Sequence, residues 1–372
     1  MEQALNRDSN ICSPGPANGN PSFEKHWFCA AICKDGKVVL QDSDSPAGFL
    51  EILENSVLAW VDYRTADSEI DIRGGAALLG FSDQLITALA DNQRLLYEDY
   101  EHEMGIKLPS IQIRINDNID VQSFHTLLLL RSNFILTIHP ILVDRRFTRL
   151  RRYSNTILSK VPIGLSTEDK LTMLLIRIID QNNDRNFEHL RQIEERGDAL
   201  NKQLMDPDTP RNLLGPQIYN MKHALITYLD ALWDTIDVVH DLRYGDANLL
   251  TNEPALLGRI ELLAGDVSRQ IGLAEHMSDV LASGLEVLQT IYNNQLQAMN
   301  NRMAYLMTYL TVLGTAVLVP NTLATIFGNS AFGMGPQDIG WYITMLVGST
   351  LIATVLAFWW VKKSGFIPKK MD

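Results

Sequence analysis

The spacing of hydrophobic positions changes along the chain, and in the first patterned region it predicts β-strands. Between residues 27 and 150, short apolar runs are bounded by polar and turn-forming residues, which is typical of β-strands. Ser132-Asn133 separates the last two runs and suits a tight hairpin turn. A helical stretch over 79–90 lies between the second and third runs, so an α/β domain is predicted. The predicted strands are 38–40, 57–63, 111–115, 126–130 and 134–137.

Residues 161–250 follow the helical period instead. One helix is expected to begin at Ser166, whose side chain would cap it, with Asp169 three residues on, and to end before Asp206. A second helix is expected over 213–240. Because a short turn joins the two, they should pair antiparallel.

A third and longer helix is predicted after Pro254. Apolar residues recur every three or four positions from Ile260 to Leu310, and no proline interrupts the chain before Pro320. At about 1.5 Å per residue, such a helix extends roughly 100 Å.

Two stretches near the C-terminus, 303–327 and 340–361, contain no charged residue. A hydrocarbon core of about 30 Å needs about 20 apolar helical residues, so each stretch is long enough to cross a membrane. Lys362 and Lys363 follow the second stretch directly. The positive-inside rule then predicts that both termini are cytoplasmic, in the plasma or inner membrane of the cell, and that 328–339 lies outside.

The predicted organisation has eight parts. They are a disordered N-terminus (1–25), a cytosolic α/β domain (26–160), an antiparallel helical pair (161–250), a stalk helix (251–302), transmembrane helix 1 (303–327), an external linker (328–339), transmembrane helix 2 (340–361) and a basic cytosolic tail (362–372).

Charge is distributed unevenly. The 372 residues carry a net charge of −12, and all but four of the basic and two of the acidic residues precede position 303. An acidic soluble part repels nucleic acid and is compatible with attracting cations, although the same charge also serves plain solubility.

Three cysteines offer no disulfide framework or paired zinc knuckles, and no nucleophile–base pair, phosphate-binding glycine loop or zincin helix is present. The sequence therefore indicates that the protein is not an enzyme.

Three segments resemble the CorA family of divalent-cation channels. Residues 59–63 (Ala-Trp-Val-Asp-Tyr) look like its early Trp-x-Asp strand, and 129–139 look like its late hairpin. Residues 301–311 (Asn-Arg-Met-Ala-Tyr-Leu-Met-Thr-Tyr-Leu-Thr) are similar to its pore helix. Pro320-Asn321-Thr322 and 326–330 (Ile-Phe-Gly-Asn-Ser) continue that similarity. The resemblance implies a funnel-shaped homopentamer in the lipid bilayer, whose first span lines the pore and whose cytosolic acids bind Mg²⁺ and hold the pore closed.

The sequence departs from the family pattern at three places. Ala304 replaces an asparagine near the cytosolic mouth, and the external linker holds one acid, Asp338. Gly328, Asn329 and Ser330 stand where the family has Gly-Met-Asn, and the resemblance makes them the selectivity segment. Asn329 and Ser330 each offer an oxygen to the water shell of an ion, but a one-residue shift turns a helical side chain by about 100°, so they cannot share one role.

One face of the first span carries the predicted pore residues. By the helical period these are Met307, Leu310, Gly314, Leu318, Asn321 and Thr325, and the matching positions of the family face the pore. Apolar rings there would gate by dewetting, and Asn321 would form a polar ring. The alternative is that these residues pack between helices or, for Asn321, make an interhelical hydrogen bond.

Carboxylates that would sense intracellular cations are Asp91, Asp99, Asp266 and Asp279, with solvated surface as the alternative. The leading hypothesis is passive uptake of Mg²⁺, or of Co²⁺ or Ni²⁺. A proton-coupled Zn²⁺ transporter and a non-conducting, membrane-tethered sensor or scaffold are the other two.

Overall fold

The computed structural model describes residues 26–363 apart from 66–68, 92–94, 116–118, 163, 207–208, 245–246, 329–332 and 334. The predicted N-terminal segment 1–25 and most of the tail 362–372 lie outside the described residues. The chain divides into two compact units, Met1–Gly284 and Leu285–Asp372.

The first unit is built on a seven-stranded mixed sheet with the order β2-β1-β3-β7-β6-β5-β4. All neighbouring strands are antiparallel except β3 and β7, which run parallel. The strands are β1 (His26–Cys33), β2 (Val38–Ser43), β3 (Ser56–Thr65), β4 (Tyr97–Asp99), β5 (Glu103–Ile115), β6 (Ile119–Arg131) and β7 (Phe134–Pro140). Arg131 pairs with Phe134, so Ser132 and Asn133 form the predicted hairpin turn.

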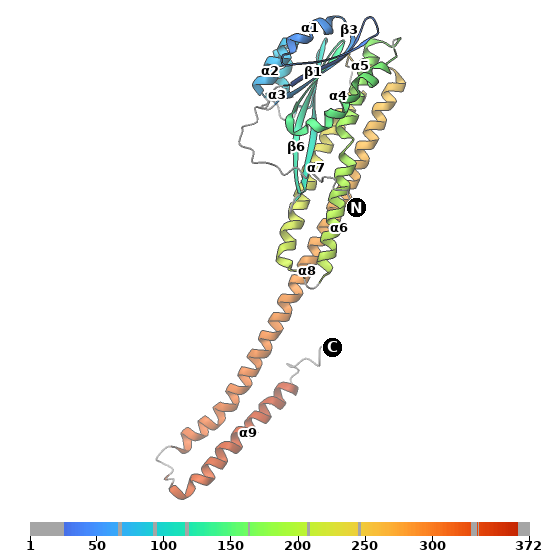
Figure 1. Ribbon diagram of the computed structural model, residues 1–372. Coiled ribbons are helices and arrows are strands. Elements are labelled where there is room, and N and C mark those ends of the chain that lie inside the picture. Colours follow the sequence, from blue (N-terminus) through green and yellow to red (C-terminus); the bar gives the residue numbers. More distant parts are fainter. Residues whose placement is uncertain are drawn as a thin grey trace, which may run out of the picture. The chain divides into compact units, whose positions relative to one another are not determined.

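Helices cover both faces of the sheet, because successive strand residues point to opposite faces. Trp27 and Tyr63 pack toward α1 (Leu50–Glu54), α2 (Glu69–Leu78) and α3 (Asp83–Asp91). Phe28 and Trp60 pack on the other side, where further helices complete a second core (Figure 1). These are α4 (Asp144–Ser159), α5 (Thr167–Asn183), α7 (Arg211–Tyr244) and the first turns of α8 (Pro254–Phe327).

The helical part follows the predicted order with one difference. Ser166 caps α5 by accepting the N–H of Asp169 at 3.1 Å, as predicted. The single helix expected from Ser166 to Asp206 is, however, two helices, α5 and α6 (Asn186–Met205), with a break at Asp184 and Arg185. α6 and α7 then pack against each other.

α8 is one helix from Pro254 to Phe327, with Pro320 inside it. Its first part packs in the first unit, while its later residues form the second unit together with α9 (Ile339–Lys363), which a short 3₁₀ turn, η4 (Pro336–Asp338), precedes. The α/β sheet domain, the long helix and the two C-terminal apolar helices confirm the predicted fold class.

Candidate ion pathway

The second unit is a hairpin of two apolar helices. α8 contains an 18-residue window with a mean hydropathy of 1.7, and Pro336–Val361 contains one with 1.8, and both helices are long enough to cross a membrane. The Tyr342 hydroxyl donates a hydrogen bond to the Ala324 carbonyl at 3.3 Å. The rings of Phe327 and Trp341 meet edge to face with centroids 6.3 Å apart. The two helices therefore contact each other near the linker that joins them.

One side of α8 faces α9. Ala316 is 2% exposed, and Val312 and Pro320, one turn away on either side, are half-buried. At about 100° per residue these three positions share a face. Ser349 and Ala353 of α9 line a cavity beside this face, together with Thr315 and Val319 of α8.

The six predicted pore residues lie on the opposite side of α8. The helical period places them at about 120° to 200° from Ala316. Met307, Leu310 and Leu318 are 65%, 67% and 66% exposed, and Asn321 and Thr325 are exposed as well. Leu306 and Leu313 on the flank are also exposed. The chain thus leaves a broad apolar surface uncovered, with Asn321 as its polar interruption.

Asn321 and Thr325 differ in how their polar groups are satisfied. The Thr325 hydroxyl donates to the Asn321 carbonyl one turn earlier, at 2.8 Å. The Asn321 side-chain amide has no hydrogen-bond partner in the described part of the chain. An unpaired amide in an apolar span needs a partner or water, because hydrocarbon offers neither donor nor acceptor.

Gly328 ends α8, and its position requires glycine. Its N–H donates to the Ala324 carbonyl at 2.9 Å. A Cβ at Gly328 would lie 2.7 Å from that carbonyl oxygen, which is closer than atoms of this kind approach. Asn329 and Ser330 lie outside the described residues. Asp338, the last residue of η4, accepts a hydrogen bond from the Gly335 N–H at 3.1 Å, so it stabilises this turn.

The four predicted sensor carboxylates have different environments. Asp266 forms an ion pair with Arg269, and Asp279 is exposed. Asp99 on β4 is half-buried, and one of its carboxylate oxygens is enclosed without a hydrogen bond. Burial, and then the negative charge of Glu98, raise the pKa of Asp99. The side chain of Asp91, at the end of α3, lies outside the described residues.

Within the described ranges, no three His, Cys, Asp or Glu side chains lie close enough to hold a metal ion. The structure also has an acidic face on α7 that was not predicted. Asp230, Asp234, Asp237 and Asp241 repeat at helical spacing on α7. Burial and the neighbouring carboxylates raise the pKa of Asp234 and of Asp241. The spacing of four aspartates at steps of four, three and four was the signal that could have indicated this face.

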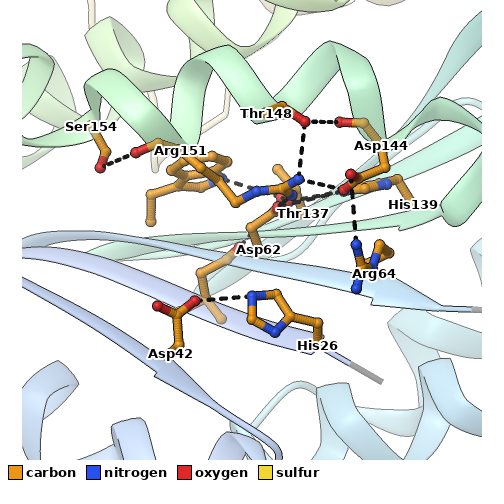
Figure 2. Close-up of polar contacts among 12 residues, drawn as sticks. His26, Asp42, Asp62, Arg64, Thr137, His139, Asp144, Thr148, Arg151 and Ser154 are labelled. Carbon is orange, nitrogen blue, oxygen red and sulfur yellow. Dashed lines mark hydrogen bonds and ion pairs between the residues drawn. The ribbon is translucent and has the colours of Figure 1, made fainter. Parts of the chain in front are cut away.

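A buried polar network joins the strands that carry the family resemblance (Figure 2). Asp62 on β3 is 1% exposed and accepts hydrogen bonds from the Thr137 hydroxyl and from Arg151 of α4. The Nε2 atom of His139 lies 3.3 Å from the Asp62 carboxylate. Arg151 also pairs with Asp144.

Several groups compete over the ionisation of Asp62. Burial alone would raise its pKa, but the charge and hydrogen bond of His139, the charge of Arg151 and the hydrogen bond of Thr137 lower it to about 2. The Trp60 indole donates to the Thr137 hydroxyl at 3.2 Å. The Trp-x-Asp strand and the late hairpin are therefore held together by one network, whose role is structural.

Comparisons with known proteins define the class of the chain. The family model described as CorA-like Mg²⁺ transporter protein matches residues 55–363, so the chain belongs to this family. It is a membrane protein with a soluble N-terminal domain and the fold of the family's divalent-cation transporters. No curated protein matches the sequence.

Three solved structures share the fold. The complete CorA magnesium transporter from Methanocaldococcus jannaschii is 17% identical, with a TM-score of 0.64, and 92% of this chain and 98% of that chain are covered. The full-length CmaX protein is 14% identical, with a TM-score of 0.59 and coverage of 94% and 99%. The ZntB cytoplasmic domain from Vibrio parahaemolyticus is 16% identical, with a TM-score of 0.51 and coverage of 72% and 98%.

Proposed function

We propose that the chain is one subunit of a homopentameric channel in the cell membrane that admits Mg²⁺, or Co²⁺ or Ni²⁺, passively. The observation that carries the proposal is the uncovered side of α8 opposite α9, which holds Asn321 among apolar residues. A hairpin of two helices encloses no pore, so an ion pathway requires several copies around an axis. The uncovered side of α8 then faces that axis, and α9 packs outside.

The pathway has three kinds of position. Met307, Leu310 and Leu318 form apolar rings that close by excluding water, and Gly314 leaves the pore wider between them. Asn321 and Thr325 form polar rings that meet the hydrated ion. Mg²⁺ gives up its waters reluctantly, so amide and hydroxyl oxygens bind its water shell.

The selectivity segment Gly328, Asn329 and Ser330 lies at the external mouth. The electrochemical gradient drives uptake, and a potential of 100 mV supplies about 4.6 kcal/mol for each divalent cation. Both termini lie in the cytoplasm. Binding of the cation to Asp91, Asp99, Asp266 and Asp279 in the cytosolic domain closes the pore when the internal concentration is high.

A proton-coupled Zn²⁺ transporter is the second candidate, because the first unit also shares the fold of the ZntB cytoplasmic domain. That likeness concerns the fold alone, so a flux measurement is needed to distinguish the passive channel from the Zn²⁺ transporter. The test is uptake of Mg²⁺, Co²⁺, Ni²⁺ and Zn²⁺ into liposomes that contain the purified chain, with and without a proton gradient.

Mg²⁺ influx driven by membrane potential alone supports the channel. Zn²⁺ flux that requires a proton gradient replaces it with the carrier. If folded and oligomeric protein passes no ion, both transport proposals fail and a sensor or scaffold remains.

A further inference from the structure

Helix α4 is strongly basic in an acidic protein. Residues 144–160 include six basic residues and one acidic residue, whereas the whole chain has a net charge of −12. Two of the six have internal partners, since Arg146 donates to the backbone carbonyls of Ile111 and Asn182, and Arg151 belongs to the Asp62 network. The other four, Arg145, Arg149, Arg152 and Lys160, are exposed. Solubility does not explain this face, because the net charge of the chain has the opposite sign.

A cavity of about 230 Å³ lies on this face, between α4 and α5. Arg149 of α4 and Lys160, the residue after α4, line it on one side, and Arg177 of α5 lines it on the other. Three cations thus meet at one hollow in the surface. Two carboxylates, Asp184 and Asp180, lie beside Arg149 and Arg177, so one positive charge at the hollow remains without a counter-charge.

Gln181 completes the cavity. Its side chain is 7% exposed and lines the hollow, yet it makes no hydrogen bond to any of the described residues. The amide atoms themselves are open to the cavity, so they can bond a group bound there or water. Tyr153, half of whose surface is exposed, offers the face of an aromatic ring in the same wall.

The ion pairs of this region do not prevent the three cations of the cavity from binding an anionic ligand. Arg149 lies 3.3 Å from Asp184, and Arg177 lies 2.9 Å from Asp180, but both pairs are exposed. Exposed pairs contribute little and exchange readily with other anions. Lys160 has no carboxylate partner in the part of the chain that the structure describes.

We propose that this cavity binds a phosphate-bearing small molecule, and specifically a nucleoside phosphate. Arginine binds phosphate oxygens in a bidentate manner and lysine adds a further charge, so Arg149, Lys160 and Arg177 hold the phosphates. A nucleobase stacks on Tyr153, as bases do on exposed aromatic rings. The Gln181 amide, with one acceptor and two donor positions, bonds the ribose or the base.

The test is calorimetric titration of the purified full-length chain in detergent, in buffer free of divalent cations. The probes are ATP, ADP, inorganic phosphate and glycerol 3-phosphate, the last of which represents the headgroup of an anionic lipid. We expect ATP and ADP to bind at one site per chain and more tightly than the other two. Binding does not depend on ion transport, so failure here leaves the proposed channel untouched.

Four variants locate the site. Arg149→Gln and Gln181→Glu should each weaken nucleotide binding at least tenfold, the second because a carboxylate repels phosphate. Tyr153→Leu should weaken nucleotides but not inorganic phosphate. Arg191→Gln is the matched control, because Arg191 on α6 is 63% exposed, compared with 64% for Arg149, and also pairs with a carboxylate. Thermal unfolding confirms that each variant is folded.

Absence of nucleotide binding overturns the proposal. An equal loss in Arg191→Gln also overturns it, since the binding would then be unspecific attraction to basic residues. If glycerol 3-phosphate binds as tightly as ATP and Tyr153→Leu has no effect, the nucleoside part fails and a lipid headgroup is the ligand.

Discussion

At the scale of single residues, Asp62 connects three elements of the sheet domain. Its buried carboxylate contacts Thr137 and His139 of β7 and Arg151 of α4. Asp62→Asn leaves Arg151 and His139 without their charged partner, and breaking a buried pair costs about 3–5 kcal/mol. We expect thermal unfolding of the purified chain to shift down by several degrees.

The matched control is Asp42→Asn. Asp42 also contacts a histidine, His26, at 2.9 Å, but its side chain is 66% exposed. Its removal should leave the unfolding temperature nearly unchanged, because exposed pairs contribute about 0–1 kcal/mol. Equal effects of the two variants would contradict the structural role of the Asp62 network.

The lowered pKa of Asp62 also leads to a prediction of how the free energy of unfolding changes in acid. Its pKa is about 2 in the folded chain, below its ordinary value of 3.8. A lowered pKa means that the contribution is present above the unfolded value and is lost as the pH falls through the folded one. Asp62 should therefore contribute on the order of 2 kcal/mol above about pH 4, most of it gone near pH 2. Acid titrations of stability should show this loss in the native chain and a reduced loss in Asp62→Asn.

Gly328, the first residue of the proposed selectivity segment, leads to a prediction about flux. A methyl group there meets the Ala324 carbonyl at 2.7 Å, so Gly328→Ala must displace the end of α8 and the residues that follow. We expect divalent flux in liposomes to fall by about tenfold or more while the chain still folds. Gly340→Ala is the control, since a Cβ at Gly340 has no neighbour within 4 Å. Unchanged flux in Gly328→Ala would show that this close approach does not shape the pathway.

At the scale of elements, sequence patterns predicted those parts that local physics determines. The cap at Ser166 and the hairpin at Ser132-Asn133 depend on neighbouring residues, and both are present. Strand β1 was not predicted, although its eight residues are mostly apolar. A strand buried on both faces lacks the alternation that marks a half-buried strand, so periodicity does not separate it from other apolar runs.

Tertiary contacts explain the other differences between prediction and structure. The break between α5 and α6 follows no proline or glycine. At the break, the buried Asn186 side chain donates a hydrogen bond at 3.2 Å to Gln270 of α8, which lies far along the chain. The expected helix 79–90 begins only at Asp83, because Gly80 adopts a positive φ of 89° and ends α2.

For the candidate site, the helical period alone placed six residues on one side of α8. Their role stays a prediction, because it depends on contacts between chains.

The face of α8 leads to a prediction of its own. Asn321→Leu keeps the branched shape of the side chain, although leucine is larger, and removes the polar ring from the proposed pathway. Flux of Mg²⁺ should fall at least tenfold, whereas folding and assembly should persist, since Asn321 has no partner within the described chain. Thr344→Val on α9 is the control, because among the described residues its hydroxyl bonds the Gly340 carbonyl alone, at 2.8 Å. Full flux through Asn321→Leu would remove this residue from the pathway.

At the scale of the whole molecule, the proposed channel requires that several copies meet around the uncovered side of α8. A single hairpin in lipid would leave the Asn321 amide unsatisfied in hydrocarbon, and a closed ring provides water for it. The purified complex should have a protein mass five times the 41.8 kDa of one chain. Native mass spectrometry measures this number, and a monomer would contradict the channel.

Cysteine cross-linking shows which side of α8 faces the axis. In a chain whose Cys12, Cys29 and Cys33 are replaced by alanine, Leu318→Cys should form disulfide-linked dimers on mild oxidation, because equivalent residues of neighbouring subunits approach each other at a narrow pore. Ala316→Cys should not form them, since position 316 is 2% exposed and faces α9 of its own chain. Positions 316 and 318 lie at nearly the same height along α8, but their side chains point in directions about 200° apart around the helix axis. Dimers from Ala316→Cys but not from Leu318→Cys would mean that the axis lies on the other side of the helix, and that the residues proposed for the pore pack against lipid.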